Sequence, residues 1–412
     1  MEKIIKQDRL ITVDILRGIA LLGILLAHFI FWHTGGPLPP HVYEKNYGPG
    51  STVANFFHMI FIFGKFFAFF AFLFGVSFHL QMQSLEKQGI YAPARFARRL
   101  FILLIIGIIH HFFWMGDILS IYATLGFTLL FFKKLNDRSL FITGIVLALA
   151  LPNKVWDAVN FLFIHLESGD PFGNSGDRYY EVVRSGSLWD ILQFNADQLA
   201  GKAQFQLLGG RASITIGFFL LGMWASRRKL FDGTLGSKPI LKKLLKRSAA
   251  LAGLMLLILL GVTVSNELFD LGWQEDPIVG FVAGIFFDTF NASLVLVMIA
   301  GIAMLLYRER WARWLYPFNY IGKLALTSYL LQTVAGLILF YGIGFGLFMK
   351  TTPGWNYIIA FGVFFLQVLV AKWWLQRFEY GPVEWLWRSA TVGKWQPFIK
   401  QKGVETTVLP SV

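Results

Sequence analysis

The first apolar segment of the chain carries two residues, Arg17 and His28, whose types and spacing suit a shared chemical task. They are eleven residues apart, which in a helix is close to three full turns and about 16 Å of rise, so both would lie on one face. A guanidinium offers planar, bidentate donors for phosphate groups. An imidazole deeper in the same span could act as a general base on an acceptor group. An extended acyl-CoA is long enough to place its phosphates at Arg17 and its thioester at His28.

A third polar residue of this segment, Asp14, precedes Arg17 by three positions. The two side chains share a helix face and can form an ion pair. A second interpretation therefore stays open, in which the pair closes the helix end and His28 makes a hydrogen bond to a neighbouring helix. Because charged residues within apolar spans are costly and usually face a cavity or a partner, these residues are the best functional candidates in the segment.

A second polar group, formed by His110, His111 and Asp117, follows a later apolar segment. His110 and Asp117 are seven residues apart, nearly two helical turns, although Gly116 favours a helix break between them. A carboxylate that orients an imidazole is a common catalytic arrangement. The group could also bind a metal ion, but adjacent histidines on one helix point in different directions, so we expect no metal. His28, His110 and Asp117 are therefore the candidate catalytic residues.

The elements that must hold these residues are apolar blocks long enough to cross a membrane. The chain has 412 residues, of which 56% are hydrophobic and 15% charged, whereas a typical soluble chain has about 25% charged residues. Backbone groups must pair internally in the bilayer, and the period-2 alternation of a membrane β-barrel is absent, so the blocks predict helices. We predict an all-α, polytopic membrane bundle of about ten spans, near residues 13–33, 55–80, 97–114, 117–132, 139–151, 212–226, 247–264, 279–306, 319–343 and 357–375.

The distribution of basic residues orients this bundle. With the N-terminus in the cytoplasm, 27 of the 37 Lys and Arg residues fall in cytoplasmic segments, as the positive-inside rule requires. Both termini are therefore expected in the cytoplasm. The net charge of +13 does not indicate nucleic-acid binding, because the basic residues lie between apolar blocks. The absence of Cys excludes disulfides and thiolate metal sites.

One long excursion on the outer side, residues 152–211, interrupts the series of spans. Two stretches within it, Val155–Leu166 and Leu188–Leu208, have the apolar spacing of helices. They are expected to lie on the outer face or to cap a cavity, with a peripheral loop as an equal alternative. No linker between soluble domains is visible. We expect one transmembrane domain over residues 1–390 and a cytoplasmic tail over residues 391–412.

Several segments of the chain resemble one family of membrane proteins. They are Val13–Ile24, Phe72–Gly75, Gly116–Leu119, Gly322–Leu330 and Gly381–Arg388. Together they are similar to the YeiB-like family, whose function is unknown, over nearly the whole chain. The combination of Gly-Asp-Ile-Leu with Gly-Pro-Val-Glu-Trp is the most specific part. The latter segment is expected to turn the chain and to anchor it at the inner interface through its tryptophans.

This resemblance extends to the transmembrane acyltransferases, including acyltransferase-3 proteins and heparan glucosaminide N-acetyltransferases. Those proteins transfer an acyl group from cytoplasmic acyl-CoA to an acceptor, often a sugar, across the membrane. In acyltransferase-3 proteins the first span carries an Arg, ten residues and a His, and Arg17 and His28 match that spacing. The resemblance implies acyl-CoA (acetyl or longer) as co-substrate, with Arg17, Asp14 and Arg388 on the donor side, where Arg388 could also meet anionic lipid.

The resemblance also implies a multi-pass protein of the bacterial cytoplasmic membrane, whose partners are the bilayer, acyl-CoA and an unknown acceptor (a sugar, lipid or small molecule). It leaves a homodimer open. Two other function classes remain. A transporter or flippase could use intramembrane His, Asp and Lys residues, although no pair of broken helices or repeated halves is visible. A scaffold or sensor without catalysis is the third class. For Lys65 and Asp288, both within spans, mutual neutralisation is the expected role.

Overall fold

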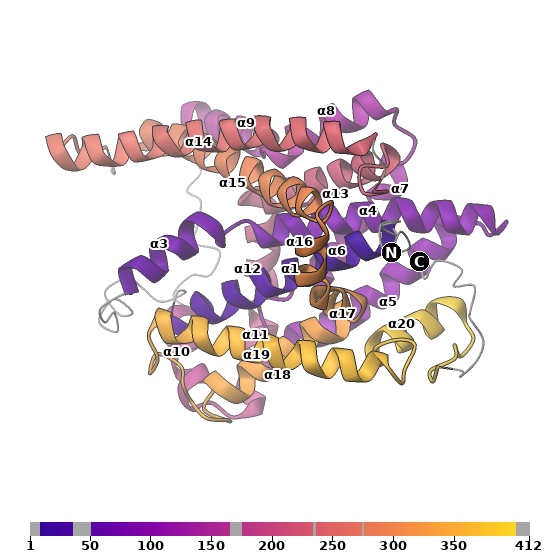
Figure 1. The fold of residues 1–412 in the computed structure, drawn as a ribbon. Coiled ribbons are helices and arrows are strands. Elements are labelled where there is room, and N and C mark those ends of the chain that lie inside the picture. The colour runs from indigo at the N-terminus through magenta and orange to yellow at the C-terminus, as the bar shows by residue number, and fades with distance from the viewer. Residues whose placement is uncertain (1–8, 36–50, 165–174, 234–235, 274–275, 401–412) are drawn as a thin grey trace.

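The structure of the protein is a computed structural model that describes residues 9–35, 51–164, 175–233, 236–273 and 276–400. Within these ranges the regular elements are helices, apart from one isolated antiparallel β-bridge between Phe378 and Ile399. Figure 1 shows the arrangement of the elements, which in chain order are α1 (Arg9–Ile30), the 3-10 helix η2 (Trp32–Thr34), α3 (Ser51–Phe61), α4 (Phe66–Lys87), α5 (Ala92–Phe113), α6 (Leu119–Gly126), α7 (Leu129–Phe132), α8 (Asp137–Ala148), α9 (Leu151–Val159), the π-helix η4 (Asn160–Ile164), α10 (Ser175–Ser185), α11 (Leu188–Asp197), α12 (Leu199–Leu208), α13 (Arg211–Arg227), α14 (Ser237–Phe269), α15 (Pro277–Leu305), α16 (Glu309–Leu315), α17 (Pro317–Lys323), α18 (Ala325–Phe340), α19 (Pro353–Leu375) and α20 (Pro382–Val392).

Many of these helices could span a membrane, as the sequence predicts. Six described segments are long and apolar enough to cross a membrane, or up to nine if each of three bent helix pairs is one span. Every predicted span range overlaps one of these segments or the shorter apolar segment Leu119–Phe132. The prediction of an all-helical, multi-span protein is confirmed. The number of about ten spans, and the side of the membrane on which the termini lie, stay predictions.

Three of the candidate spans are bent, which the sequence did not indicate. The helix axes turn by 49° between α8 and the α9–η4 segment, by 64° between α12 and α13, and by 92° between α17 and α18. The expectation that no helices are broken is therefore wrong. The sharpest bend, at Leu324 between α17 and α18, lies beside the cavity described below.

Helix α1 lies inside the bundle, whereas α14 and α15 run along its edge as a pair (Figure 1). In the apolar window of α1, 61% of residues are buried, compared with 17% for α14 and 28% for α15. The exposed leucines and isoleucines of the α14–α15 pair suit contact with lipid chains. The charged residues of α1 are instead surrounded by protein, so they must be satisfied within the bundle.

Close packing of α1 against α17 places charged residues at the end of the bundle where α1 begins. A Cβ added to Gly18 would lie 2.1 Å from the carbonyl oxygen of Phe318, and one added to Gly322 would lie 1.8 Å from that of Asp14. Small residues let two membrane helices approach this closely. The contact brings Asp14 and Lys323 into the wall of one cavity.

The outer excursion and the C-terminal segment both pack on the bundle. Within residues 152–211 the described part forms α9, η4, α10, α11 and α12, so the described parts of the two stretches predicted as helices are largely helical. His165 and Leu166, at the end of the first stretch, lie outside the described residues. Helices α11 and α12 contact α5 and α13 respectively. Helix α20 passes through the expected domain boundary at residue 390, and the strand-like pairing at Ile399 holds the chain against the end of α19. Residues 401–412 of the expected tail lie outside the described residues.

Candidate functional site

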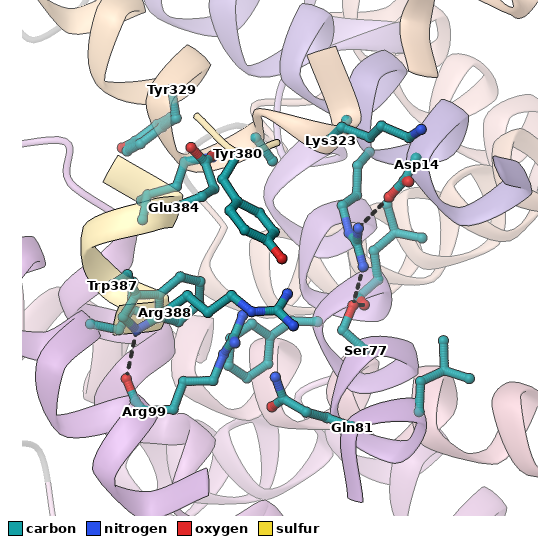
Figure 2. Close-up of a pocket in the computed structure, with 18 of the residues that line it drawn as sticks. Asp14, Ser77, Gln81, Arg99, Lys323, Tyr329, Tyr380, Glu384, Trp387 and Arg388 are labelled. Carbon is teal, nitrogen blue, oxygen red and sulfur yellow. Dashed lines mark hydrogen bonds and ion pairs between the residues drawn. The ribbon is translucent and has the colours of Figure 1, made fainter. Parts of the chain in front are cut away.

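A cavity of about 880 Å³ lies at the end of the bundle where α1 begins, between α1, α4, α5, α17, α18 and α20 (Figure 2). We call it the basic cavity, because five cationic side chains line it: Arg17, Arg99, Lys323, Arg388 and Lys400. Its wall continues with the apolar side chains of Phe70, Leu73, Leu103, Leu119 and Tyr329. A volume of this size suits a small-molecule ligand, and the mixed wall suits one with an anionic head and a less polar arm.

The ion pair that the sequence predicts between Asp14 and Arg17 is present in the wall of the basic cavity. One guanidinium nitrogen of Arg17 lies 2.5 Å from the Asp14 carboxylate, and a second donates to the Ser77 hydroxyl at 2.6 Å. These contacts fix the plane of the guanidinium, while a quarter of the Arg17 side chain stays exposed. The pair thus holds Arg17 in place without removing it from the cavity wall.

Arg99 and Arg388 complete a set of three guanidiniums. The Arg99 guanidinium lies 3.7 Å from the centre of the Trp387 ring, and the Trp387 indole N–H donates to the Arg99 carbonyl at 2.9 Å. When the amide oxygen of Gln81 faces Arg99, it accepts two hydrogen bonds of 3.0 Å from the Arg99 guanidinium. Arg388 lies over the Tyr380 ring and reaches into the cavity next to Arg99, across from Asp14 and Ser77 (Figure 2). Stacked arginines keep their donors available for a planar anion such as a phosphate.

Helix α5 repeats the Arg–His spacing of α1. Arg99 and His110 are eleven residues apart in one uninterrupted helix, as are Arg17 and His28 in α1. Both arginines line the basic cavity, and both histidines contact the ring of Tyr329. Two parallel helices therefore span about 16 Å between a cationic end and a histidine end. Sequence reasoning missed Arg99, although the same spacing rule applied to α5 would have found it.

Glu384 of α20 connects the cavity wall to the bend between α17 and α18. Its carboxylate accepts hydrogen bonds from the backbone N–H groups of Leu326 and Thr327, at 2.6 and 2.9 Å, and from the Thr327 hydroxyl at 2.5 Å. These amides belong to the first turn of α18, which lacks intrahelical acceptors. A carboxylate there also stabilises the helix dipole. Burial nevertheless raises the pKa of Glu384, and the hydrogen bonds from Thr327 and Leu326 only partly oppose that rise.

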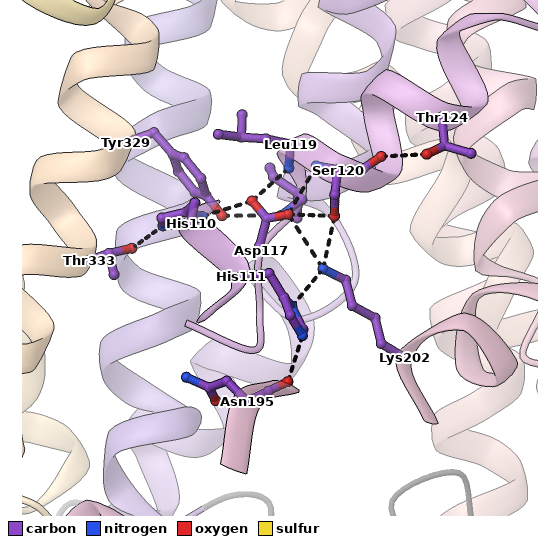
Figure 3. A network of polar contacts seen from close by, with 11 residues as sticks. His110, His111, Asp117, Leu119, Ser120, Thr124, Asn195, Lys202, Tyr329 and Thr333 are labelled. Atoms are coloured by element: carbon purple, nitrogen blue, oxygen red, sulfur yellow. Dashed lines mark hydrogen bonds and ion pairs between the residues drawn. The ribbon is translucent and has the colours of Figure 1, made fainter. Parts of the chain in front are cut away.

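At the histidine end, His110 lies in a line of three polar groups (Figure 3). Its Nδ1 is 2.7 Å from the Asp117 carboxylate, and its Nε2 is 2.8 Å from the Thr333 hydroxyl. The Asp117 carboxylate also accepts from the backbone N–H groups of Leu119 and Ser120. The predicted pairing of His110 with Asp117 is present, with the Gly116 break between α5 and α6 turning the carboxylate back onto the imidazole.

His111 points away from His110 toward the outer excursion. Its Nε2 is 2.8 Å from the Asn195 carbonyl of α11, and its Nδ1 is 3.1 Å from the ammonium of Lys202 in α12. Lys202 also lies 3.4 Å from Asp117 and 3.1 Å from the Ser120 hydroxyl. The excursion therefore caps this site, rather than forming a peripheral loop. We call the whole set the His110 cluster: His110, His111, Asp117, Ser120, Asn195, Lys202 and Thr333.

The two histidines diverge, as expected for neighbours on one helix: His110 contacts Asp117 and Thr333, and His111 contacts Asn195 and Lys202. Among the described residues no group of three His, Cys, Asp or Glu side chains is arranged to hold a metal ion.

His28 lies beside the His110 cluster, and Tyr329 lies between the two. The His28 ring centre is 5.2 Å from Trp114 and 6.3 Å from Tyr329, and the Tyr329 ring is 5.0 Å from His110. The Tyr329 hydroxyl accepts from the Ile118 backbone N–H at 3.2 Å. Since Tyr329 also lines the basic cavity, its ring is the wall between that cavity and both histidines.

Two polar residues outside this site have other partners than the sequence predicts. Lys65 is fully buried, donates to the Met59 carbonyl at 2.6 Å and lies over the ring of Phe290. Asp288 instead forms an ion pair with Lys154 of α9 at 3.0 Å. The predicted neutralisation of Lys65 by Asp288 is therefore wrong, because a carbonyl near the end of α3 and aromatic rings satisfy the lysine.

The fold and this site define a class: a helical, multi-pass membrane protein with a basic cavity that ends at buried histidines. Residues 225–394 match the family described as "Protein of unknown function (DUF418)". The chain is 28% identical over 433 residues to the uncharacterized protein YxaH of Bacillus subtilis, covering 98% of this chain and 99% of that protein. It is 28% identical over 422 residues to the uncharacterized protein YeiB of Escherichia coli, covering 96% and 99% respectively. The chain is thus similar to the DUF418 family model over part of its length, and to these two bacterial proteins over nearly all of it.

Proposed function

We propose that the protein is a membrane acyltransferase, which takes an acyl group from cytoplasmic acyl-CoA and passes it to an acceptor at or near the outer face. The observation that supports this proposal is the extent of the basic cavity, which is lined by arginines and by Tyr329. It extends from three arginines to Tyr329, whose ring contacts His28 and His110. A donor with phosphates at one end and a reactive carbonyl at the other matches that polarity.

On the donor side, Arg17, Arg99 and Arg388 would hold the phosphates of CoA by bidentate, charge-assisted hydrogen bonds. The apolar wall beyond them, including Leu73 and Leu103, would take the pantetheine arm. The arm would run along α1 and α5, because each helix carries its arginine and histidine about 16 Å apart. The thioester would then arrive at the Tyr329 ring.

On the acceptor side, His110 would serve as general base and acid. Asp117 fixes the proton on Nδ1, so Nε2 presents a lone pair that can accept the proton of an acceptor hydroxyl or amine. His28, whose ring centre is 6.3 Å from that of Tyr329, would contact the same carbonyl. The Tyr329 side chain must rotate for donor and base to meet, which keeps water away from the thioester until then.

A transporter or flippase is the second candidate, and the 92° bend between α17 and α18 is the observation in its favour. Transporters often expose the N-terminus of a broken helix to their substrate. Here Glu384 accepts hydrogen bonds from the first amides of α18, so that N-terminus is already occupied by a protein carboxylate. The bend therefore supports the acyltransferase as well, because it sets the direction of the helix that carries Tyr329.

Thermal denaturation of the detergent-solubilised protein with acetyl-CoA and with octanoyl-CoA tests the proposal. Binding to the folded state alone raises the melting temperature, and we expect a rise with at least one of the two compounds. Arg17→Ala should abolish the rise, whereas Arg310→Ala, at an exposed position of α16, should leave it intact. No rise with either compound would contradict the acyltransferase. Substrate flux in proteoliposomes, driven by a pH gradient without any CoA compound, would favour the transporter.

A further inference from the structure

We propose that Thr333 is the nucleophile of a Thr333–His110–Asp117 triad and carries the acyl group as an ester between donor and acceptor. This inference rests on the proposed acyltransferase function and adds a covalent step to it. The three groups come from separate elements, α18, α5 and the connection between α5 and α6. Their hydrogen bonds of 2.8 and 2.7 Å run from hydroxyl to imidazole to carboxylate (Figure 3). The same order of groups activates hydroxyl nucleophiles in unrelated acyl-transfer enzymes.

The proton positions in this line follow from the contacts of Asp117. Its two oxygens accept from the N–H groups of Leu119 and Ser120, from the Ser120 hydroxyl and from Lys202. A carboxylate with that many donors is ionised, so the imidazole proton lies on Nδ1 of His110. The Nε2 atom then has only a lone pair, and the Thr333 hydroxyl donates to it. This is the protonation state in which an imidazole can remove a proton from a hydroxyl.

The direction of the Thr333 hydroxyl is unusual within this protein. Threonines in helices commonly donate to a backbone carbonyl three or four residues earlier. That arrangement holds for Thr128, Thr215, Thr263, Thr289 and Thr391. The Thr333 hydroxyl is directed at an imidazole on another helix instead. Thr327, in the first turn of the same helix, likewise donates to a side chain of another helix. A helical threonine can donate its hydroxyl to the backbone carbonyl four residues earlier. The Thr333 hydroxyl contacts His110 and not such a carbonyl.

The position of Thr333 relative to the donor is also suitable. It lies one helical turn beyond Tyr329 on the same face of α18, and Tyr329 is the wall of the basic cavity. A thioester that displaces the Tyr329 ring therefore meets Thr333 next. Thr333 is 7% exposed, which keeps competing water away from an ester formed there.

The chemistry balances without any further reagent. The Thr333 oxygen attacks the thioester carbonyl carbon while His110 takes the hydroxyl proton. The carbon–sulfur bond then breaks, the sulfur takes that proton from His110, and CoA leaves as a thiol. In the second half, the acceptor hydroxyl or amine gives its proton to His110 and attacks the ester carbon. The carbon–oxygen bond to Thr333 breaks, and the proton returns to the Thr333 oxygen.

The test uses the full-length protein in detergent with two acetyl donors and no acceptor: acetyl-CoA and 4-nitrophenyl acetate. We expect release of CoA or nitrophenol together with one acetyl group on the peptide that contains Thr333, measured by mass spectrometry. Thr333→Ser should keep this label, whereas Thr333→Val and His110→Gln should lose it. Thr289→Val is the matched control, because its hydroxyl donates to the Ile285 carbonyl. Melting temperature and gel filtration show whether each variant is folded.

Three outcomes separate this inference from the proposed function. If acetyl-CoA binds but leaves no acetyl group on the wild-type protein, or if folded Thr333→Val releases CoA at the wild-type rate, the covalent step is overturned and the acyltransferase stands. If 4-nitrophenyl acetate labels Thr333 while acetyl-CoA neither binds nor reacts, the nucleophile stands and the proposed donor is wrong. Labelling that is equal in Thr333→Ser and Thr333→Val would assign the acetyl group to another residue and overturn the inference.

Discussion

The basic cavity and the His110 cluster are both polar, yet they are built in opposite ways. In the cavity, cationic side chains lie around about 880 Å³ of space, and Arg99 and Arg388 rest on aromatic rings. In the cluster, Asp117 and His110 are fully buried or nearly so, with protein partners on each side. The difference teaches that the cavity is shaped to receive a ligand, whereas the cluster is shaped to keep one arrangement of protons.

Tyr329 connects the two regions physically. Helix α18 carries it, and Glu384 of α20 holds the first turn of that helix from the cavity side. The cluster holds the same helix from the other side through Thr333. Helix α18 is therefore one connection between the two regions, beside α1 and α5, which each carry an arginine of the cavity and a histidine of the other end. Substitutions of side chains that lie in one region alone can be designed to spare the other.

The largest expected effect is that of Asp117→Asn on acyl transfer. The amide removes the charge that holds the His110 proton on Nδ1, and general-base catalysis of this kind contributes about 10² to 10⁴-fold. We expect a loss of that order in the rate of CoA release from acetyl-CoA. Affinity for acetyl-CoA, measured by isothermal titration, should change little, because Asp117 is not part of the basic cavity.

Asp197→Asn is the matched control for this substitution, since Asp197 pairs with Arg178 at the exposed surface of α11. It should leave the rate unchanged. A rate within about twofold of wild type in folded Asp117→Asn would mean that the His110 cluster joins helices and takes no part in proton transfer.

Next in size is the effect of Arg99→Met on donor binding. Methionine keeps contact with the Trp387 ring but removes the guanidinium, and a hydrogen bond to a charged group is worth about 1.5 to 3 kcal/mol, or roughly 10 to 100-fold in affinity. Titration with acetyl-CoA should show this weakening, with the release rate at saturating donor largely retained. Exposed Arg313 on α16 supplies the control Arg313→Met. Equal affinity in both variants would exclude Arg99 from the donor site.

How far the sequence predicts the fold depends on the physical origin of each feature. Helices and the multi-span class follow from long apolar blocks, because the bilayer leaves few other ways to satisfy the backbone. The bends do not follow from composition. At the 92° turn beside Leu324, the first amides of α18 donate to Glu384, which is 60 residues away from Leu324 in the chain. Hydropathy contains no information about such a distant cap.

The candidate site shows the same limit. His28, Arg17, His110 and Asp117 could be named because charged or titratable residues are conspicuous in apolar spans. Thr333 could not, since threonine is common in membrane helices and its hydroxyl is usually satisfied by its own backbone. Its role depends on the approach of α18 to α5. Lys202 was missed for a similar reason, because α12 reaches Asp117 only after the outer excursion folds back.

A smaller effect is expected from Lys202→Met. The Lys202 ammonium lies 3.1 Å from His111 and 3.4 Å from Asp117, and so helps to orient that carboxylate. Its loss should reduce the rate of CoA release by about tenfold, because the backbone donors to Asp117 remain. Lys202→Arg should restore most of the rate by returning a cation. If Met and Arg variants have the same rate, the contribution of Lys202 is not its charge.

The smallest effect concerns Glu384 and appears in the pH dependence of stability. Burial raises the pKa of Glu384 above that of an unfolded Glu, so the folded state binds this proton more tightly than the unfolded chain. The stability that the protonated group contributes is present below the unfolded pKa and is lost as pH rises through the folded pKa. Glu384→Gln keeps an acceptor for Leu326 and Thr327 but cannot titrate.

We therefore expect the melting temperature of the wild type to fall relative to that of Glu384→Gln as pH rises from about 4 toward neutrality. Glu309→Gln, on exposed α16, is the control and should run parallel to wild type. Glu384→Ala should be less stable at every pH, by about 1 to 3 kcal/mol, because the first amides of α18 lose their acceptor. Parallel curves for wild type and Glu384→Gln would show that the pKa of Glu384 is the same in the folded and unfolded states, and the link between α20 and Tyr329 would then be independent of pH.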